Sequence, residues 1–470
     1  MPEKNDDIGI IGLGVMGRNL ALNVADHGFA VAGYDLDKDK VDSLVNEKNS
    51  AHTIQTATDI KQFVGLLKRP RAMILLVPAG TAVDTVIESL KKHLEFDDLI
   101  IDAGNSNFKD TNRRLQSCAE RGLDYLGMGV SGGEKGARYG PSIMPGGSRR
   151  GYERVKPVLE AAAAKINGAP CVAYLGKGSA GHYVKMVHNG IEYGIMQLIA
   201  EAYDFMRRGM GLTNDRLHEI YAEWNRQDLN SYLIEITARI FQKKDERSGN
   251  YLVDFILDCA DQKGTGMWTA CDALNVQEPV PTIDIAVQMR NLSMRKEERR
   301  AGSEKLPGPS VHFTGDAERW VQRLGRALYA AVIITYGQGM AQLVQASETY
   351  DYGLDMGVVA QIWRGGCIIR SAILDTIMAA FRQTPGLPNL LLDPELGGRV
   401  TERQADLRYI IEAATAWGIP IPGFMLSMAY FDAYRSARLP ANLIQAQRDY
   451  FGSHTYKRVD LQGDFHSEWQ

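Results

Sequence analysis

Cysteine is scarce in this 470-residue chain, and the C-x-x-C spacing does not occur in it. Cysteines stand at only five scattered positions, Cys118, Cys171, Cys259, Cys271 and Cys367. An odd number of scattered cysteines argues against a closed disulfide framework and is typical of a reducing compartment. The nine histidines and five cysteines form no ligand-like spacing, so we expect no metal site.

The sequence also lacks a basic excess and an apolar leader. The formal net charge is -4, which does not favour nucleic-acid binding. The N-terminus, MPEKNDDIGIIGLG, is polar before its first apolar run, and glycines interrupt that run. It resembles neither a signal peptide nor a membrane anchor, so we expect a cytoplasmic protein that binds neither nucleic acid nor membranes.

The chain has 45% hydrophobic residues, and its length exceeds that of a single hydrophobic core, so we expect at least two domains. From residue 8 to about residue 175, short apolar runs alternate with amphipathic segments, which predicts βαβ units around a parallel sheet. The predicted strands are Ile8–Leu13, Ala30–Asp35, Ala72–Val77, Leu99–Asp102 and Tyr125–Val130.

The alternation stops after about Gly181, and long apolar-periodic stretches follow, which predicts a largely helical second domain. The clearest helices are Ile191–Met206, Leu324–Ala346 and Leu407–Ala416. From Leu439 the chain has no core of its own, and such a tail is mobile unless it docks. Its aromatic residues favour docking on the parent domain or on a partner; they are Tyr450, Phe451, Tyr456, Phe465 and Trp469.

A G-x-G-x-x-G motif follows the first predicted strand and opens a helix. It consists of Gly12, Leu13, Gly14, Val15, Met16 and Gly17. The first glycine permits a tight turn, the second lets a pyrophosphate approach the backbone, and the third allows close packing of helix and strand. A glycine-rich turn that merely joins a strand to a helix is the alternative. The acidic end of the next strand, about 20 residues on, favours a dinucleotide site in a Rossmann-type domain.

That acidic end is Asp35, followed by Leu36 and Asp37. A carboxylate here binds both hydroxyls of an adenosine ribose and repels the 2′-phosphate of NADP. One charge pair at ~5 Å and an effective dielectric of about 20 is worth ~3 kcal/mol before screening. We therefore expect NAD to be preferred, with NADP the weaker coenzyme. In the alternative, Lys38 and Lys40 bind the phosphate while the two aspartates cap the next helix.

The segment KMVHNGIEY places four polar side chains on one face if it is helical. Lys185, His188, Asn189 and Glu192 stand at positions i, i+3, i+4 and i+7. Apolar residues cover the other faces, so the stripe indicates a reactive surface. A solvated stripe with an ordinary attraction between lysine and glutamate is the alternative.

Polar, glycine-containing segments follow two further strands. They are Asp102–Ser106 and Ser131–Glu134, and such strand ends bind ligands in doubly wound sheets. Turn formation explains their glycines equally well. The segment Gln262–Gly266 offers Lys263 and Thr265 to a phosphate, although a loop that ends a helix has the same composition.

With these segments assembled, the sequence closely resembles the 6-phosphogluconate dehydrogenase family nearly end to end. The resemblance is carried by the segments IGLGVMGRNLALN, DAGNS, GVSGGEKGARYGPSIMPGG, GHYVKMVHNGIEYGIMQLI, IWRGGCIIRS and LIQAQRDYFGSHTY, together with the Gln262–Gly266 segment and the MWT after it. It implies a Rossmann-type domain at residues 1–179, an all-helical substrate and dimerisation domain at 180–438, and a tail at 439–470 that reaches the other subunit of a homodimer.

The resemblance also implies roles for individual residues. Lys185 is the general base that removes the proton of the C3 hydroxyl, and Glu192 is the acid that protonates C1 of the enediol. A lysine acts as a base only when neutral, which costs ~3–4 kcal/mol; we assign this to burial and to the nearby cation Lys263. The implied substrate contacts are Asn105, Ser131, Gly132, Gly133, His188 and Asn189, with Tyr193, Lys263, Thr265 and Arg290 at the phosphate, joined by Arg448 and His454 from the partner's tail.

The sequence departs from the family pattern at the coenzyme. The common members carry Asn-Arg-Thr where Asp35, Leu36 and Asp37 stand here, and a V-K-A-G turn where this chain has Val77, Pro78, Ala79 and a glycine. Both changes remove positive charge and favour NAD, while Asn105 and the substrate residues are unaffected.

Two other functions stay open at this stage. One is a β-hydroxyacid dehydrogenase for a small 3-hydroxy acid, although such proteins are usually shorter and lack the tail. The other is a non-catalytic nucleotide-binding protein, whose signature would be loss of the reactive lysine or acid. Both Lys185 and Glu192 are present.

Overall fold

The first part of the chain folds around a seven-stranded sheet in the order β3-β2-β1-β4-β5-β6-β7. We analysed a computed structural model that describes residues 6–49, 51–310 and 313–469. The strands are β1 Ile8–Ile11, β2 Val31–Tyr34, β3 Ile54–Ala57, β4 Ala72–Leu75, β5 Leu99–Asp102, β6 Asp124–Ser131 and β7 Ser142–Gly147. All neighbours are parallel except β6 and β7. The predicted parallel sheet is confirmed.

Sequence reasoning missed two of these strands, β3 and β7, and both lie at the edges of the sheet. The sequence of β3, IQTA, is short, and its two central residues are not buried. The sequence of β7, SIMPGG, contains a proline and two glycines, which read as a turn. Edge strands tolerate these residues because one side of the strand needs no ladder partner.

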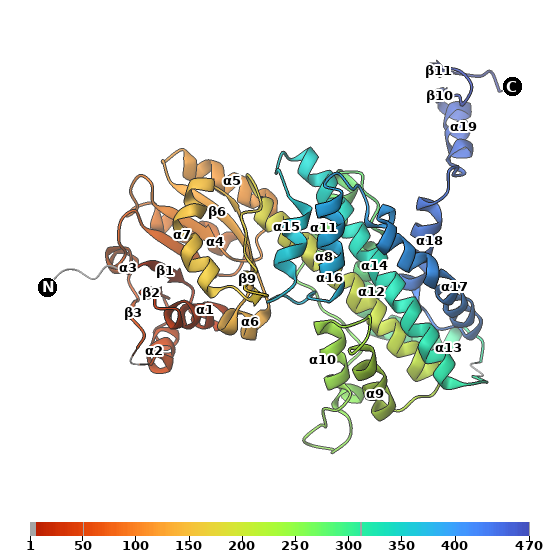
Figure 1. Ribbon diagram of the computed structural model, residues 1–470, viewed down its shortest axis with the longest axis horizontal. Helices are drawn as coiled ribbons and strands as arrows, with labels where there is room; N and C mark the ends of the chain where they lie inside the picture. The colour runs from red at the N-terminus through yellow and green to blue at the C-terminus, as the bar shows by residue number, and fades with distance from the viewer. Residues whose placement is uncertain (1–5, 50, 311–312, 470) are drawn as a thin grey trace.

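Helices cover both faces of the sheet (Figure 1). They are α1 Val15–Asp26, α2 Lys38–Glu47, α3 Ile60–Leu66, α4 Thr81–Leu90, α5 Phe108–Ala119, α6 Gly133–Tyr139 and α7 Arg149–Ala162, with a small hairpin of β8 Lys165–Ile166 and β9 Ala169–Pro170 after them. One apolar core joins α1, α2 and α7 to the sheet, and a second joins α3, α4 and α5. These two layers make the domain a doubly wound Rossmann-type unit.

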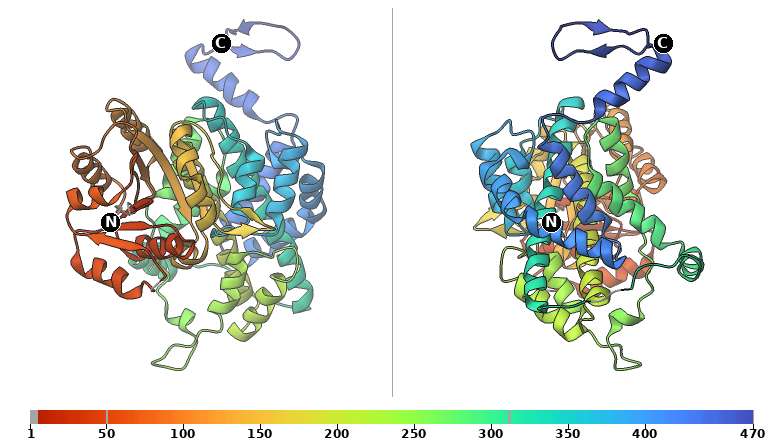
Figure 2. Two further views of the ribbon diagram at one scale, coloured as in Figure 1. Left: turned by 60° about the vertical axis from the view of Figure 1, so that its left-hand side comes forward. Right: turned by 90° about the vertical axis from the view of Figure 1, so that its right-hand side faces the viewer.

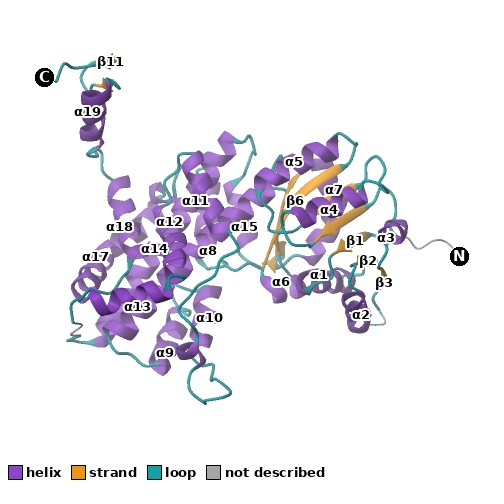
Figure 3. Ribbon diagram, turned by 180° about the vertical axis from the view of Figure 1, so that it is seen from behind, coloured by secondary structure: helices purple, strands orange, loops and turns teal. Residues whose placement is uncertain are grey.

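A larger helical domain follows, so the predicted fold class is confirmed (Figure 3). Its elements are α8 Ala180–Asp204, η1 Phe205–Gly209, α9 Asn214–Trp224, α10 Tyr232–Ile240, η2 Leu252–Phe255, α11 Thr265–Asn275, α12 Pro281–Ser293, α13 Lys296–Lys305, α14 Ala317–Thr349, α15 Met356–Trp363, α16 Ile373–Gln383, η3 Leu390–Leu392, α17 Pro394–Trp417 and α18 Pro422–Tyr434. By length and composition α14 could cross a membrane, but 94% of its most apolar window is buried in the molecule. Its apolar side chains therefore serve the core.

Glycines let α8 cross unusually close to the end of the sheet. A Cβ atom on Gly181 would lie 2.2 Å from the carbonyl oxygen of Gly127 and 2.6 Å from the amide nitrogen of Gly146. A Cβ atom on Gly129 would lie 2.3 Å from the Cβ of Lys185. Only glycine permits this approach, which places Lys185 directly against β6.

The tail is an ordered unit that projects from the helical domain (Figures 1 and 2). It consists of α19 Ala441–Gly452 and a hairpin of β10 Tyr456–Lys457 and β11 Asp464–Phe465. Asp449, which is fully buried, accepts hydrogen bonds from the amides of Thr455 and Ser467 and from the Trp469 indole. These bonds fold the tail upon itself although it has little contact with the rest of the chain.

Candidate active site

The glycine turn after β1 has the geometry that a dinucleotide requires. Gly12 has a φ of 91°, and a Cβ there would meet the carbonyl oxygen of Leu76 at 2.5 Å. A Cβ on Gly17 would lie 1.8 Å from the carbonyl oxygen of Gly12. Gly14 has nothing within 4 Å of its Cβ position, and as the N-cap of α1 it makes no side-chain capping bond. The backbone is therefore open where a pyrophosphate would meet the helix N-terminus.

Asp35 closes this turn from the end of β2. Its Oδ2 accepts a hydrogen bond from the Leu13 amide at 2.8 Å, and its Oδ1 accepts one from the Asp37 amide at 3.0 Å. Asp37 caps α2 through the Asp39 amide. Leu36 is 82% exposed. The carboxylate of Asp35 is thus fixed at the mouth of the turn, where a ribose is expected.

Lys40 tempers this negative charge. Its Nζ lies 3.8 Å from Asp35 Oδ1 and 3.4 Å from Asp37 Oδ2. The capping bond from the Asp39 amide means that the alternative in which the aspartates cap the next helix holds for Asp37. Because Lys40 is 45% exposed, its side chain has room to turn toward a ligand.

Two further turns lie at the carboxyl edge of the sheet, after β4 and β5. The first contains Val77, Pro78 and Ala79, of which the last two are exposed. The second contains Asn105, which is also exposed. The turns lie close together, because a Cβ on Gly104 would lie 3.4 Å from the carbonyl oxygen of Val77. The structure thus brings Asn105 to the predicted coenzyme turn.

The predicted polar stripe lies on α8 and faces the end of β6. Lys185 Nζ donates to Asn189 Oδ1 at 2.8 Å and lies 3.5 Å from His188 Nδ1. His188 Nε2 lies 3.3 Å from Ser131 Oγ. Lys185, His188 and Asn189 are all buried, so the alternative of a solvated stripe is wrong for them.

Burial sets the protonation of this cluster. It lowers the pKa of the Lys185 amine, against the opposing charge of Glu192. It holds the pKa of His188 well below its ordinary value, and Lys185 adds to this effect. Burial also raises the pKa of Glu192, while the charges of Lys185 and Arg290 oppose the rise. A lysine that loses its proton more readily than usual and a glutamate that holds its proton more readily than usual therefore share one face of α8.

Burial is the main cause of the lowered pKa of Lys185, whereas the sequence predicts a contribution from the cation Lys263 as well. In the structure Lys263 is exposed just before α11. The shift in the lysine pKa thus comes chiefly from the site in which α8 holds the side chain.

A group of predicted phosphate ligands gathers one turn further along α8. The guanidinium of Arg290, from α12, lies 3.5 Å from the centre of the Tyr193 ring. Gly266 packs against the same ring, because its Cβ position lies 2.4 Å from Tyr193 Cδ2. Thr265, the first residue of α11, is buried beside it. Three helices therefore bring Tyr193, Thr265 and Arg290 together.

The structure leaves two predicted residues away from this group. Arg448 and His454 are exposed on the projecting tail, outside the body of the same chain (Figure 1). A single chain therefore does not bring them to Lys185.

Two of the predicted substrate contacts are glycines that follow β6. Gly132 has a φ of 113°, and a Cβ there would meet the carbonyl oxygen of Gly366 at 2.4 Å. Gly133 has nothing within 4 Å of its Cβ position. Gly132 thus locks the turn to the helical domain, whereas Gly133 leaves its backbone open to a ligand.

Sequence reasoning missed two residues that shape the site. The Trp363 ring stands edge-on to His188, with ring centres 5.6 Å apart. Gly129 makes room for Lys185, as described above. Neither residue has a local sequence signal, because its role depends on a contact between segments far apart in the chain.

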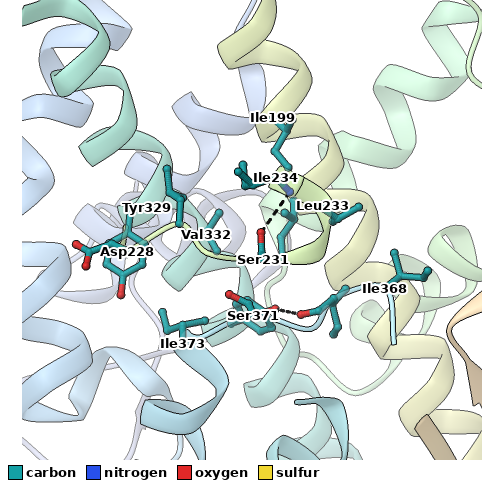
Figure 4. Close-up of a pocket in the computed structure, with 14 residues that line it drawn as sticks. Ile199, Asp228, Ser231, Leu233, Ile234, Tyr329, Val332, Ile368, Ser371 and Ile373 are labelled. Atoms are coloured by element: carbon teal, nitrogen blue, oxygen red, sulfur yellow. Dashed lines mark hydrogen bonds between the residues drawn. The ribbon is translucent and has the colours of Figure 1, made fainter. Parts of the chain in front are cut away.

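An apolar cavity of about 20 Å³ lies elsewhere in the helical domain (Figure 4). Ile195, Ile199 and Val332 are among its lining residues. Ile195 follows Lys185 by ten residues, or about 15 Å along α8, so this cavity is separate from the polar cluster. Among the described residues, no group of three or more His, Cys, Asp or Glu side chains is placed to hold a metal ion.

Known proteins match this chain along nearly its whole length. A family model described as the NAD binding domain of 6-phosphogluconate dehydrogenase matches residues 7–176, and one described as the C-terminal domain of 6-phosphogluconate dehydrogenase matches residues 181–469. The NADP(+)-dependent, decarboxylating 6-phosphogluconate dehydrogenase of Bacillus subtilis is 52% identical, with 99% of both chains covered. The decarboxylating enzyme of Escherichia coli is 49% identical over the same shares.

A solved structure agrees with these matches. The 6-phosphogluconate dehydrogenase of Plasmodium falciparum, studied in its apo form, with NADP+ and with 6-phosphogluconate, superposes with a TM-score of 0.95. It is 46% identical, and the match covers 98% of this chain and 100% of the other.

Proposed function

Because the chain belongs to the 6-phosphogluconate dehydrogenase family, we propose that it oxidises and decarboxylates 6-phosphogluconate to ribulose 5-phosphate and carbon dioxide in the pentose phosphate pathway. The observation that carries this proposal is the buried Lys185, whose pKa burial lowers, so that its amine loses its proton more readily beside the carboxyl edge of the sheet. Glu192 stands on the same helix face, as the second half-reaction requires.

Lys185 begins the reaction by taking the proton of the C3 hydroxyl. The bound nicotinamide supplies the acceptor for the C3 hydride, which leaves a 3-keto acid. The bond between C1 and C2 then breaks, carbon dioxide leaves, and the electron pair passes into the C3 oxygen. Protonated Lys185 stabilises that oxygen and returns its proton. Glu192, whose pKa burial raises, then protonates C1 of the enediol, which was C2 of the substrate, while Lys185 takes back the proton of the neighbouring hydroxyl, and ribulose 5-phosphate results.

The remaining polar groups hold the substrate in this scheme. Its carboxylate and hydroxyls are bound by Asn105, Ser131, Gly132, Gly133, His188 and Asn189. Tyr193, Lys263, Thr265 and Arg290 bind the phosphate. The contact between the Arg290 guanidinium and the Tyr193 ring supports this assignment, since it orients a cation beside the α8 face that bears Glu192.

The coenzyme in this proposal is NAD, with NADP the weaker alternative. Support comes from the Asp35 carboxylate at the mouth of the glycine turn and from the uncharged Leu36 and Pro78. The Bacillus subtilis relative is NADP(+)-dependent, so the proposal distinguishes this chain from a protein with which it shares 52% identity.

The proposal includes a homodimer that exchanges tails in the cytoplasm. Arg448 and His454 of one chain would complete the phosphate site of the other. Support comes from the projecting, folded tail and from its exposed apolar side chains, among them Leu443 at 61% and Phe451 at 73% exposure. In this proposal the coenzyme domain spans residues 1–179 and the substrate and dimerisation domain spans 180–438. The tail that reaches the other subunit spans 439–470.

The first experiment measures initial rates of nicotinamide reduction with 6-phosphogluconate, comparing NAD and NADP under identical salt. Faster turnover with NAD supports both the reaction and the coenzyme preference. Faster turnover with NADP keeps the reaction and overturns the preference. No reduction with either coenzyme would overturn the reaction itself, and a small unphosphorylated 3-hydroxy acid would be the next substrate to test.

A further inference from the structure

A buried ionic cluster lies beneath the two turns that follow β4 and β5. At its centre Arg114, from α5, is 2% exposed, and Asp102, the last residue of β5, is fully buried. Arg114 Nη1 donates to Asp102 Oδ2 at 3.2 Å. Removing two charges from water is costly unless their hydrogen bonds are completed. The other hydrogen-bond partners of this pair therefore show which segments it holds in place.

The other donors of Arg114 bond residues on the coenzyme side of the cluster. Its Nη2 donates to the carbonyl oxygen of Gly80 at 2.9 Å, and its Nε donates to Asp84 at 2.8 Å. Gly80 ends the turn that contains Val77, Pro78 and Ala79, and it is the N-cap of α4. One guanidinium therefore fixes both the end of this turn and the first turn of the helix after it.

Asp102 directs its bonds to the substrate side. Its Oδ1 accepts from the Gly104 amide at 3.1 Å, and its Oδ2 accepts from the Ser106 hydroxyl at 2.7 Å. Arg114 Nη1 also donates to the Ser106 hydroxyl, at 3.1 Å. Gly104 and Ser106 flank the exposed Asn105, so the pair of charges holds both sides of that residue.

We propose that Arg114 is a positioning residue that sets Asn105 at a fixed distance from the coenzyme turn. It touches neither ligand and acts through Gly80 on one side and through Asp102 and Ser106 on the other. The inference rests on the proposed function, because it takes the two turns to bind coenzyme and substrate. The two turns lie side by side, since a Cβ on Gly104 would lie 3.4 Å from the Val77 carbonyl oxygen, which leaves little room for them to move separately.

The tyrosine of β6 provides a matched control. Tyr125 donates from its hydroxyl to Asp102 Oδ2 at 3.1 Å, the same oxygen that Ser106 binds. Ser106→Ala and Tyr125→Phe therefore each remove one hydroxyl from one buried oxygen. Only Ser106 belongs to the turn and also bonds Arg114, so the two substitutions separate positioning from stability.

The experiment compares these two variants with wild type by melting temperature, KM for both ligands and kcat. We expect both to melt somewhat lower. Ser106→Ala should raise KM for coenzyme and for 6-phosphogluconate together, each about fivefold, because the turn loses its hydrogen bonds to Asp102 and Arg114. Tyr125→Phe should leave both KM values within about twofold. Arg114→Lys keeps the charge but loses the fork of donors, so it should raise both KM values more than Ser106→Ala does.

Equal effects of Ser106→Ala and Tyr125→Phe on KM would show that the cluster serves stability alone and would overturn the proposal. A rise in KM for only one ligand would also overturn it, because the turns would then be independent. Wild-type turnover reports separately on the proposed function. If wild type did not turn over 6-phosphogluconate, the Kd of NADH would still distinguish the two variants, since the link to the Gly80 turn is a coenzyme effect.

Discussion

Substitution of Leu36 by arginine should shift the coenzyme preference toward NADP. Leu36 is 82% exposed and lies between two aspartates, of which Asp35 is fixed by the Leu13 and Asp37 amides. The change therefore adds a cation beside the expected 2′-phosphate position without removing a buried contact. At ~5 Å and an effective dielectric of about 20, one added charge is worth ~3 kcal/mol.

Solvent reduces that figure substantially. An exposed charge retains roughly a third of it, or ~1 kcal/mol, which corresponds to about a fivefold change. The ratio of kcat/KM for NADP to that for NAD should rise about fivefold in Leu36→Arg. Leu36→Gln, which adds polarity without charge at the same position, should stay within about twofold of wild type.

Steady-state kinetics with both coenzymes, at fixed ionic strength, measure this ratio. Equal ratios in the arginine and glutamine variants would refute the charge reasoning. Faster wild-type turnover with NADP would also refute it, and Lys40, which lies 3.8 Å from Asp35, would then be the phosphate ligand to test. The rise in the ratio should shrink at high salt, because screening weakens an exposed charge.

Four other outcomes follow from the geometry of the site and its surroundings. Lys185→Met should lower kcat by at least about 100-fold while the melting temperature is kept, and near-normal turnover would exclude the lysine as base. Glu192→Gln should lower kcat more than it raises KM; the reverse pattern would mean that the residue binds substrate rather than protonates it. Gly129→Ala should reduce both melting temperature and kcat, since the new Cβ would lie 2.3 Å from the Lys185 Cβ, whereas Gly65→Ala, with nothing within 4 Å, should be silent in both assays. Burial raises the pKa of Glu201 from 4.5 to about 7, so the folded state holds a proton that the unfolded chain releases, and about 3 kcal/mol of stability is lost as pH rises from about 4.5 to about 7. Melting temperatures across that range test this, and a Glu201→Gln variant with the same pH slope as wild type would contradict it.

The sequence predicts those parts of the fold whose signal is local. Five strands, the glycine turn and the acidic end of β2 all appear within short segments, because buried parallel strands are continuous apolar runs. The helix that carries Lys185 has a local signal as well, since its polar residues repeat at helical spacing. By contrast, β7 contains Pro145 and two glycines, and only its antiparallel pairing with β6 makes it a strand.

Residues that act across the fold are hidden from such reading. Arg114 stands in an ordinary amphipathic helix, next to the exposed Arg113, and nothing local separates the two. Its buried guanidinium bonds Gly80, in the turn after β4, and Asp102, at the end of β5, which are distant from each other in sequence. Predicting such a residue requires the sheet order, which a single sequence does not supply.

The chemistry of the lysine and the packing of the two domains have one physical origin. Gly129, Gly146 and Gly181 let α8 lie directly on β6 and β7, and this approach removes Lys185 from water. Dehydration lowers the pKa of the amine, and the same packing brings His188, its neighbour on α8, to Ser131 at the end of β6. A side chain on any of these glycines would have to separate the helix from the sheet, and water would enter beside Lys185. The pKa of Lys185 would then rise toward its ordinary value, so under the proposed mechanism the close packing of α8 on the sheet is itself a requirement for catalysis.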